Sequence, residues 1–153
     1  MTQPTPTVPA WQGINHIALV TPDLEATLHF YQTVLGLKLV ALLPAGEAHG
    51  HHAILSAGGK GLGLHFFEDA AAQIFTHPDA LGALHFIPGA LQHIALSLPD
   101  EEAGQALLAH LHEVGIQTTE LMEQEATQSF GLLDNTGLMI EIAWFKPGRF
   151  PLS

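Results

Sequence analysis

The sequence predicts an α+β fold in which two tandem βαβββ modules form a curved, cup-shaped mixed sheet with the helices outside. An internal repeat is the main observation: residues 16–26 read HIALVTPDLEA and residues 93–103 read HIALSLPDEEA. In both copies a strand-like run is followed by a helical pattern and three further strand-like runs. The 153 residues, 47% of them apolar, suffice for one domain with its own core. One helix covers only one face of a four-stranded sheet, so the two modules are expected to form one structural domain.

The first module is expected at residues 12–68. Its opening strand is INHIALV, and a helix is expected over TPDLEATLHFYQTVLG, with Thr21 as its cap, proline in its first turn and Gly36 at its end. The apolar face of this helix is predicted to carry Leu24, Leu28, Tyr31 and Leu35. The three strands that follow are LKLVALLP, HHAILSAGG and GLGLHFFE.

The second module is expected at residues 91–145 and repeats this plan. The strand LQHIALSL precedes the helix LPDEEAGQALLAHLHEVG, whose inward residues are predicted to be Leu107, Leu108, Leu111 and Val114. The strands IQTTELME, TQSFGLLD and GLMIEIAWF follow, with DNTG as a tight turn before the last one. Outside the modules, residues 1–11 are expected to be a flexible N-terminal segment, residues 69–90 a connector and residues 146–153 a C-terminal tail.

The charge of the chain excludes several classes of partner. Four Lys and Arg residues face fifteen Asp and Glu, for a formal net charge of −11, so neither nucleic acid nor an anionic membrane surface is an expected partner. No apolar run is long enough to span a bilayer. The opening MTQPTPTVPA does not have the pattern of a signal peptide, so a cytoplasmic location is expected. The absence of cysteine excludes disulfides and thiolate metal sites.

Four polar residues occupy strand positions where apolar residues are expected. Strand alternation turns His16 and His93 away from the helices, and the last strands of the two modules place His65 and Glu141 at equivalent positions. A carboxylate inside LMIEIAW is costly to bury unless it is paired or bound to a metal ion. A single strand histidine is usually an ordinary core or surface residue, but a repeated set of four favours a metal centre. Three imidazoles and one carboxylate suit Fe(II), Mn(II), Ni(II), Co(II) or Zn(II).

The stretches INHIALVTPDLEATLHFYQTVLGLKLV, LQHIALSLPDEEA and DNTGLMIEIAW resemble the vicinal oxygen chelate superfamily. Its members include glyoxalase I, methylmalonyl-CoA epimerase, extradiol dioxygenases, and fosfomycin and bleomycin resistance proteins. The resemblance implies paired βαβββ modules around a divalent metal ion that chelates two neighbouring substrate oxygens. His16, His93 and Glu141 match ligand positions of that family directly, whereas glyoxalase-like and epimerase-like members carry Glu or Gln at the position of His65. The resemblance therefore leaves His65 as a fourth ligand or as an acid–base group beside the metal.

The resemblance implies several activities, and the charge of the chain favours one of them. Glutathione, CoA and fosfomycin carry anionic groups that are usually met by Lys or Arg, of which this chain has few. We therefore expect an Fe(II)-dependent dioxygenase of extradiol type that acts on a small, largely uncharged aromatic or enol substrate. One alternative is a glyoxalase I-like lyase or epimerase-like isomerase that uses the metal with Glu141 or His65 to move a proton. Another is a non-catalytic drug-binding protein like the bleomycin resistance proteins.

Further site residues are expected beside the metal. His52, in the stretch HGHH, is a candidate acid–base imidazole, with an exposed polar hairpin as the alternative. Phe67, Phe130 and Met139 are candidates to line the substrate site, and Tyr31, the only tyrosine, is expected in the core. The resemblance also implies a homodimer. It leaves open whether one chain or two chains complete the metal centre.

Overall fold

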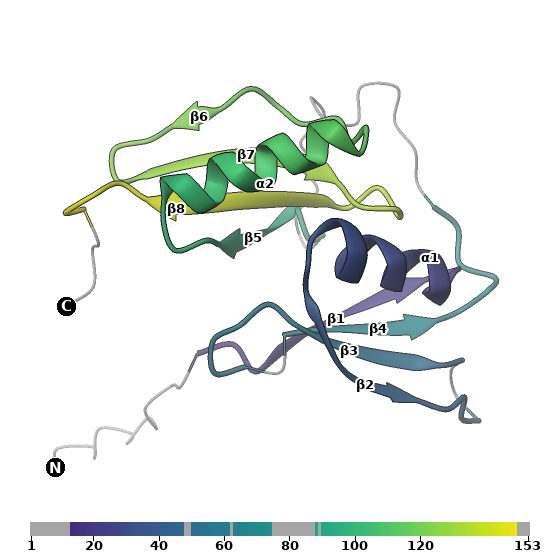
Figure 1. Ribbon diagram of the computed structural model, residues 1–153. Coiled ribbons are helices and arrows are strands. Elements are labelled where there is room, and N and C mark those ends of the chain that lie inside the picture. The colour runs from purple at the N-terminus through teal and green to yellow at the C-terminus, as the bar shows by residue number, and fades with distance from the viewer. Residues whose placement is uncertain (1–12, 48–49, 62, 75–87, 89, 150–153) are drawn as a thin grey trace, which may run out of the picture.

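The computed structural model describes residues 13–47, 50–61, 63–74, 88 and 90–149. Its elements are β1 (His16–Thr21), α1 (Leu24–Leu28), the π-helical segment η1 (His29–Val34), β2 (Lys38–Leu43), β3 (His52–Ser56), β4 (Gly63–Glu68), β5 (His93–Ser97), α2 (Glu101–Glu113), β6 (Met122–Glu123), β7 (Thr127–Leu133) and β8 (Met139–Phe145) (Figure 1). Each half is thus a strand, a helix and three strands, as predicted. The segment 1–11 and most of the connector 69–90 lie outside the described residues.

Each module forms its own four-stranded sheet, in which the first strand lies next to the last. The strand orders are β1-β4-β3-β2 and β5-β8-β7-β6, with β1 parallel to β4 and β5 parallel to β8. The other neighbouring strands are antiparallel. The prediction of two tandem βαβββ modules is confirmed, although the described strands form two separate sheets rather than one continuous sheet. The parallel pairing brings together the two strands of each module that carry the candidate ligands.

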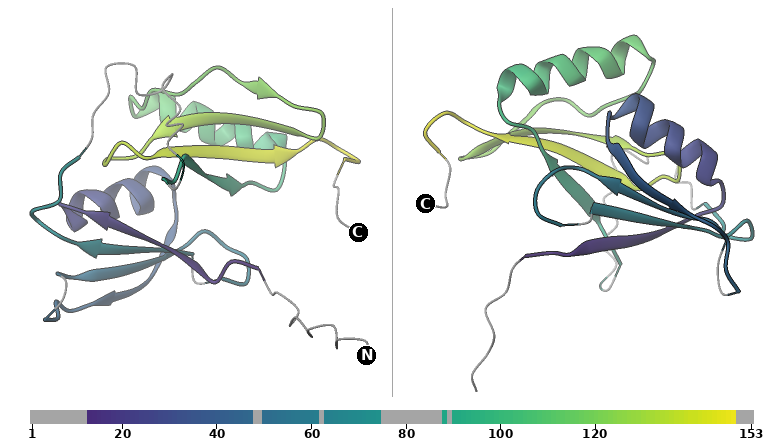
Figure 2. Two further views of the ribbon diagram at one scale, coloured as in Figure 1. Left: turned by 180° about the vertical axis from the view of Figure 1, so that it is seen from behind. Right: turned by 60° about the horizontal axis from the view of Figure 1, so that its bottom comes forward.

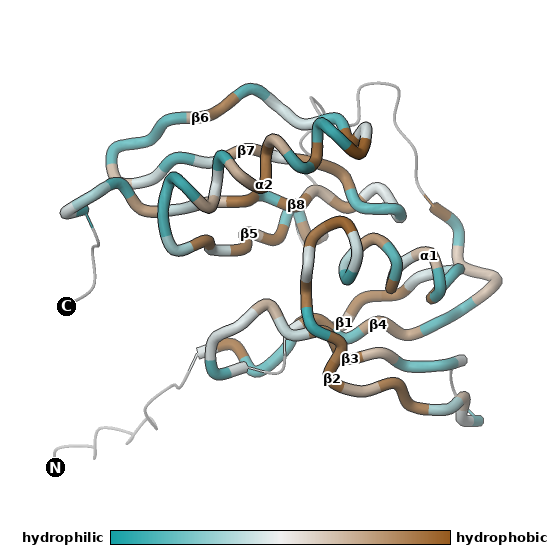
Figure 3. The backbone as a smooth tube through the Cα atoms, viewed as in Figure 1, coloured by the Kyte–Doolittle hydropathy of each residue, from teal (hydrophilic) through white to brown (hydrophobic). Residues whose placement is uncertain are grey.

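Both helices lie on the same side of the two sheets. They are in front of the strands in Figure 1, and the strands are in front when the molecule is seen from behind in Figure 2. α2 alternates between hydrophobic and hydrophilic stretches in Figure 3, as expected of a helix with one face on a sheet. None of the described helices is long and apolar enough to cross a membrane.

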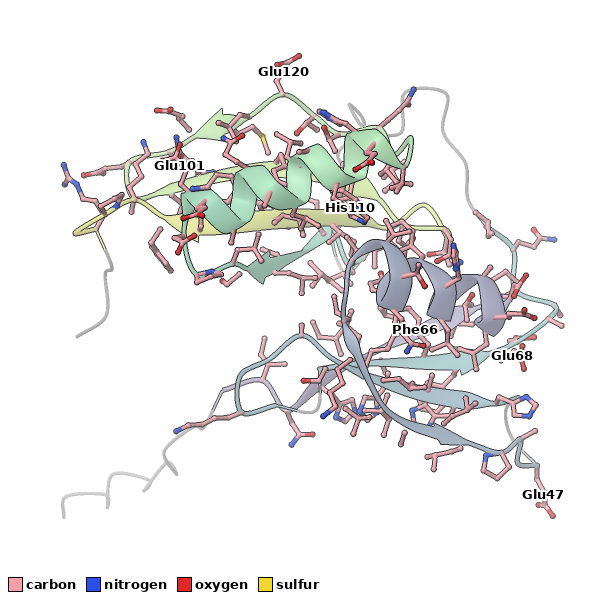
Figure 4. All side chains as sticks on the ribbon, viewed as in Figure 1. Glu47, Phe66, Glu68, Glu101, His110 and Glu120 are labelled. Atoms are coloured by element: carbon pink, nitrogen blue, oxygen red, sulfur yellow. The ribbon has the colours of Figure 1, made fainter. Side chains whose placement is uncertain are left out.

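One hydrophobic core fills the space between helices and sheets. Its fully buried large side chains include Tyr31, Phe66, Leu111, Phe130 and Trp144, so both modules contribute to it. Figure 4 shows Phe66 on the side of β4 that faces α1. The opposite side of both sheets, called the helix-free side below, carries no described helix.

The helices begin later than predicted, because their caps are aspartates. Asp23 and Asp100 each accept a hydrogen bond at 2.9 Å from the backbone N–H three residues further on. Thr21 is not the cap, since its Oγ1 is buried and lies 2.7 Å from Oγ1 of Thr27. The proline precedes the cap in both copies. An aspartate cap also places negative charge where the helix dipole favours it.

Two other predicted details are wrong. Val114 is 49% exposed because α2 ends before it. The strand predicted at residues 116–123 is reduced to the two residues of β6. Within the predicted strand, the N–H of Gly131 in β7 donates its hydrogen bond to Oγ1 of Thr119 at 2.8 Å. A side-chain oxygen thus takes the position that a backbone carbonyl would have in a regular strand pair.

Candidate functional site

The helix-free side of the first sheet gathers three histidines. His16 opens β1 and His65 lies in β4, and their rings stack with centroids 4.2 Å apart and planes inclined by 14°. His52, the first residue of β3, has its ring centroid 5.0 Å from that of His65. The register explains this grouping, because His65 pairs with Ala18 and Ile54. His16 and His52 are each two residues from those partners, and therefore on the same side of the sheet.

The surroundings of His65 favour its neutral form. The residue is only 7% exposed. Burial is the largest cause that lowers the pKa of His65 below its ordinary value, followed by the charges of His16 and His52. Nε2 of His65 is buried and has no hydrogen-bond partner among the described residues. The neutral imidazole is the form that binds a metal ion or accepts a proton, and a buried nitrogen without a partner is uncommon in folded proteins.

His52 is a buried residue of this cluster and not part of an exposed hairpin. Its ring stacks on that of Phe67, with centroids 3.9 Å apart. Phe67 is two residues beyond His65 on β4, so the two aromatic side chains continue the wall that His16 and His65 begin. The neighbouring His51 is exposed and lies with Nδ1 3.1 Å from Oε2 of Glu68. His49, at the start of the HGHH stretch, lies outside the described residues.

The helix-free side of the second sheet carries His93 and Glu141. His93 opens β5, and its Nε2 lies 3.1 Å from Oε2 of Glu141 in β8. Its Nδ1 lies 2.9 Å from Oε1 of Gln92. An amide oxygen can only accept a hydrogen bond, so this contact is a bond in the Nδ1–H tautomer of His93, in which the Nε2 lone pair faces the carboxylate. The approach of Nε2 to the carboxylate is favourable only with a positive charge on or between the two groups, which is either a proton or a metal ion.

The geometry of this second pair fits a divalent ion. Metal–ligand bonds of about 2.1 Å place ligand atoms on adjacent corners of an octahedron roughly 3 Å apart. Nε2 of His93 and Oε2 of Glu141 are 3.1 Å apart. Imidazole and carboxylate are also a donor set that Fe(II), Mn(II), Co(II), Ni(II) and Zn(II) accept. The pair can therefore serve as half of a metal centre without rearrangement of the strands.

The four predicted ligands are arranged as two pairs, one on each sheet. His16 and His65 belong to the first module, and His93 and Glu141 belong to the second. Within the part of the chain that the structure describes, no group of three or more His, Asp or Glu side chains could hold one ion. A single chain in this arrangement thus does not bring all four ligands around one metal.

Two residues that the sequence reasoning missed contact the candidate ligands. Asn15 Oδ1 lies 2.8 Å from Nδ1 of His16, and Gln92 Oε1 occupies the equivalent place beside His93. The signal was present in the repeat, since an amide side chain directly precedes the histidine in both copies, as NHIAL and QHIAL.

Two of the three candidate lining residues lie on the helix-free side. Phe67 is beside His52, and Met139 is two residues before Glu141 on β8. Phe130 on β7 pairs with Ile142, the residue after Glu141 on β8, so its side chain lies on the opposite side of the sheet from Glu141. That side chain is fully buried in the core beside Trp144. The prediction that Phe130 lines the substrate site is wrong for that reason.

Comparisons with known proteins agree with this fold. The profile of the glyoxalase/bleomycin resistance protein/dioxygenase superfamily matches residues 13–142. A glyoxylase/bleomycin resistance protein/dioxygenase domain from Frankia sp. EAN1pec superimposes with a TM-score of 0.70 at 19% identity, covering 91% of this chain and 96% of that one. The antibiotic-binding protein TnmS3 from Streptomyces sp. CB03234 superimposes with a TM-score of 0.65 at 19% identity, covering 91% and 100%. A lactoylglutathione lyase from Agrobacterium tumefaciens superimposes with a TM-score of 0.59 at 18% identity, covering 88% of this chain and 95% of that one.

At these identities the likeness to solved structures is one of fold. No protein of curated function matches the sequence closely enough to count as a relative.

Proposed function

The chain belongs to the glyoxalase/bleomycin resistance protein/dioxygenase superfamily, and on that basis we propose that it is a metal-dependent dioxygenase of extradiol type. Its substrate in this proposal is a small, largely uncharged aromatic diol or enol. His16, His93 and Glu141 hold the ion, which for this reaction is Fe(II). The observation that carries the proposal is the 3.1 Å spacing of His93 Nε2 and Glu141 Oε2, because an imidazole and a carboxylate stand there at the separation of adjacent ligands of a divalent ion.

Two copies of the chain complete the metal centre in this proposal. Each sheet presents one pair of ligands on its helix-free side, and one chain does not gather both pairs. A twofold dimer can set the first sheet of one copy against the second sheet of the other, which creates two equivalent centres. Val20 and Leu43 support this, since strand alternation puts them on the helix-free side and they are 56% and 43% exposed. A second copy would cover such apolar side chains.

The bound ion would supply adjacent open positions for two neighbouring substrate oxygens and for O2. The chain itself would orient the ring and handle the hydroxyl protons. Phe67 and His52 present flat faces beside His65, which suits the stacking of a planar substrate. Nε2 of His65 is the group placed to accept a proton from a substrate hydroxyl, because its lowered pKa keeps the ring neutral.

His65 can act as the fourth ligand or as this proton acceptor, and the His65→Ala variant separates the two roles. A ligand role predicts loss of bound iron. A proton-acceptor role predicts that iron is retained while ring cleavage is lost. His52 is assigned as a second acid–base candidate, and its substitution is expected to leave the iron content unchanged in either case.

The distribution of positive charge limits how much negative charge a substrate can carry. Nζ of Lys146 is paired with Oε2 of Glu123 at 3.3 Å. The remaining cations, Lys38, Lys60 and Arg149, are exposed surface residues. A substrate with a phosphate or several carboxylates would find few partners, whereas a neutral diol needs only the metal and the aromatic wall.

The experiment mixes two double variants that are purified apart. His16→Ala/His65→Ala removes the ligands of the first module, and His93→Ala/Glu141→Ala removes those of the second. Each is expected to be inactive after anaerobic loading with Fe(II), when O2 uptake and ring-cleavage product are followed with a panel of catechols. Equimolar mixing gives heterodimers with one intact centre, so roughly a quarter of wild-type activity should return.

The outcomes reject different parts of the proposal. A wild-type protein that binds iron but consumes no O2 with any catechol is not a dioxygenase of this type. A mixture that stays inactive, while wild type is active and subunits exchange, rejects the shared centre.

A glyoxalase-like or epimerase-like enzyme is the second candidate, and Glu141 favours it, since a carboxylate beside His93 is placed to move a proton next to a metal. Ni(II)- or Zn(II)-dependent turnover of a hemithioacetal without O2 supports this candidate. A drug-binding protein is the third, favoured by the likeness of fold to TnmS3. Drug binding that is unchanged after metal chelation supports that one.

A further inference from the structure

We propose that Asn15 and Gln92 are positioning residues that hold His16 and His93 in the tautomer with the proton on Nδ1. In that tautomer the lone pair on Nε2 is free for a metal ion. This inference rests on the proposed metal centre and adds to it a pair of outer residues that set the orientation and protonation of the ligands.

The geometry is repeated in both modules. Oδ1 of Asn15 lies 2.8 Å from Nδ1 of His16, and Oε1 of Gln92 lies 2.9 Å from Nδ1 of His93. Neighbouring residues of a regular strand point to opposite faces, so they rarely bond in this way. Both amides stand one residue before their strand begins, where the backbone is free of that alternation.

The chemistry gives these contacts a consequence for metal binding. A neutral imidazole carries one proton, and the hydrogen bond made by one ring nitrogen decides whether that nitrogen keeps it. Free imidazole side chains prefer the proton on Nε2, which would block the nitrogen that faces Glu141. An amide oxygen accepts from Nδ1–H and so reverses this preference, without adding a negative charge to the site.

The exposure of Asn15 argues against a purely structural role for it. Asn15 and His16 are both exposed, and a hydrogen bond between exposed groups contributes little to folding. A structural role therefore predicts almost no effect when Asn15 loses its oxygen. A positioning role predicts a large effect on metal affinity with unchanged stability.

The test uses the full chain with ¹⁵N-labelled histidine, and Co(II) alone as the probe. In the metal-free wild type, nitrogen NMR should find the proton of His16 on Nδ1, whereas His93, whose Nε2 also faces Glu141, is followed through the Co(II) affinity. Asn15→Leu and Gln92→Met keep size but lose the oxygen, and in Asn15→Leu the proton of His16 should move to Nε2. Co(II) affinity, read from its visible absorption, should fall by about 10- to 100-fold in each variant.

Three further variants serve as controls. Asn15→Asp and Gln92→Glu keep an oxygen acceptor and should restore both the tautomer and the Co(II) affinity. Gln105→Met changes an exposed amide on α2 and should alter neither quantity.

Failure of the inference can be told from failure of the proposed function. An Nε2–H tautomer of His16 in the metal-free wild type, or full Co(II) affinity in Asn15→Leu and Gln92→Met, overturns the inference and leaves the metal centre standing. A wild-type protein that does not bind Co(II), Fe(II) or Zn(II) at all overturns the proposed metal centre and this inference with it.

Discussion

Tyr31 Oη donates a hydrogen bond to Asp134 Oδ2 at 2.7 Å, and this bond joins the two modules. Tyr31 lies in η1 of the first module, and Asp134 begins the DNTG turn before β8 of the second. Both residues are buried, at 0% and 6% exposure. The other carboxylate oxygen accepts from the backbone N–H groups of Thr136 and Leu138. The turn that leads into the Glu141 strand is thereby fixed against the helix of the other half.

Tyr31→Phe is expected to lower the free energy of unfolding by about 2 kcal/mol, because it leaves a buried carboxylate oxygen without its donor. Urea denaturation with linear extrapolation measures this. A double-mutant cycle with Asp134→Ala is the control, since the coupling between the two changes isolates their bond. A coupling near zero would show that the loss does not come from the bond between Tyr31 and Asp134.

The same bond predicts how the protein responds to alkali. Burial first, and then the charge and hydrogen bond of Asp134, raise the pKa of Tyr31 above its ordinary value of 10.0. A group whose pKa is raised in the folded state contributes stability that is full below its unfolded pKa, and that stability declines as the pH rises further. Stability should therefore be constant up to about pH 10 for this group and fall above it.

The single tyrosine makes the alkaline measurement unambiguous. Tyrosinate absorbance should appear together with loss of circular dichroism, in one cooperative step, and not as a separate titration of the folded protein. Tyr31→Phe should lose the absorbance change. Tyrosinate formation in a protein that keeps its folded spectrum would contradict the buried bond.

Local patterns predicted each module but not the way the modules meet. The repeat and the alternation of polar and apolar residues located the strands, and they put His16 and His65 on one side of a sheet. Contacts such as Tyr31–Asp134 span 103 residues and leave no periodic trace in the sequence. The division of the four ligands into two pairs was therefore beyond the reach of pattern reasoning.

The remaining errors arose where a single hydrogen bond or the register of two strands decides the local structure. Oγ1 of Thr119 takes the acceptor position of a strand carbonyl, which shortens the strand predicted before β7. Asp23 takes the capping position predicted for Thr21. Phe130 faces the core because it pairs with Ile142, and only the register of β7 and β8 decides this. These choices depend on single hydrogen bonds or on strand register, which composition does not reveal.

Gly104→Ala is expected to destabilise the protein, although alanine favours helices. A Cβ at Gly104, in α2, would lie 2.5 Å from Cζ3 of Trp144, which is buried and cannot move freely. Overpacking costs about 1–3 kcal/mol and helix propensity returns about 1 kcal/mol, so the net loss should be about 1 kcal/mol. Thermal and urea unfolding measure it.

Ala106→Gly is the matched control on the exposed face of α2. It should cost about 1 kcal/mol through propensity alone. If Gly104→Ala instead stabilises the protein, the helix does not sit against the tryptophan ring as closely as the structure has it.

Phe66 and Phe67 are neighbours on β4 with opposite environments, so leucine substitutions at the two positions should separate stability from substrate binding. Phe66 is 1% exposed and packs against Tyr31 with ring centroids 4.8 Å apart, so Phe66→Leu should cost about 1–2 kcal/mol of folding free energy and leave KM unchanged. Phe67 stacks on His52 on the helix-free side, so Phe67→Leu should raise KM for a ring substrate with a smaller loss of stability. Steady-state kinetics and urea unfolding on the same preparations measure both quantities. The reverse pattern would mean that the substrate enters from the helix side of the sheet, and the metal centre would then have to be sought among other residues.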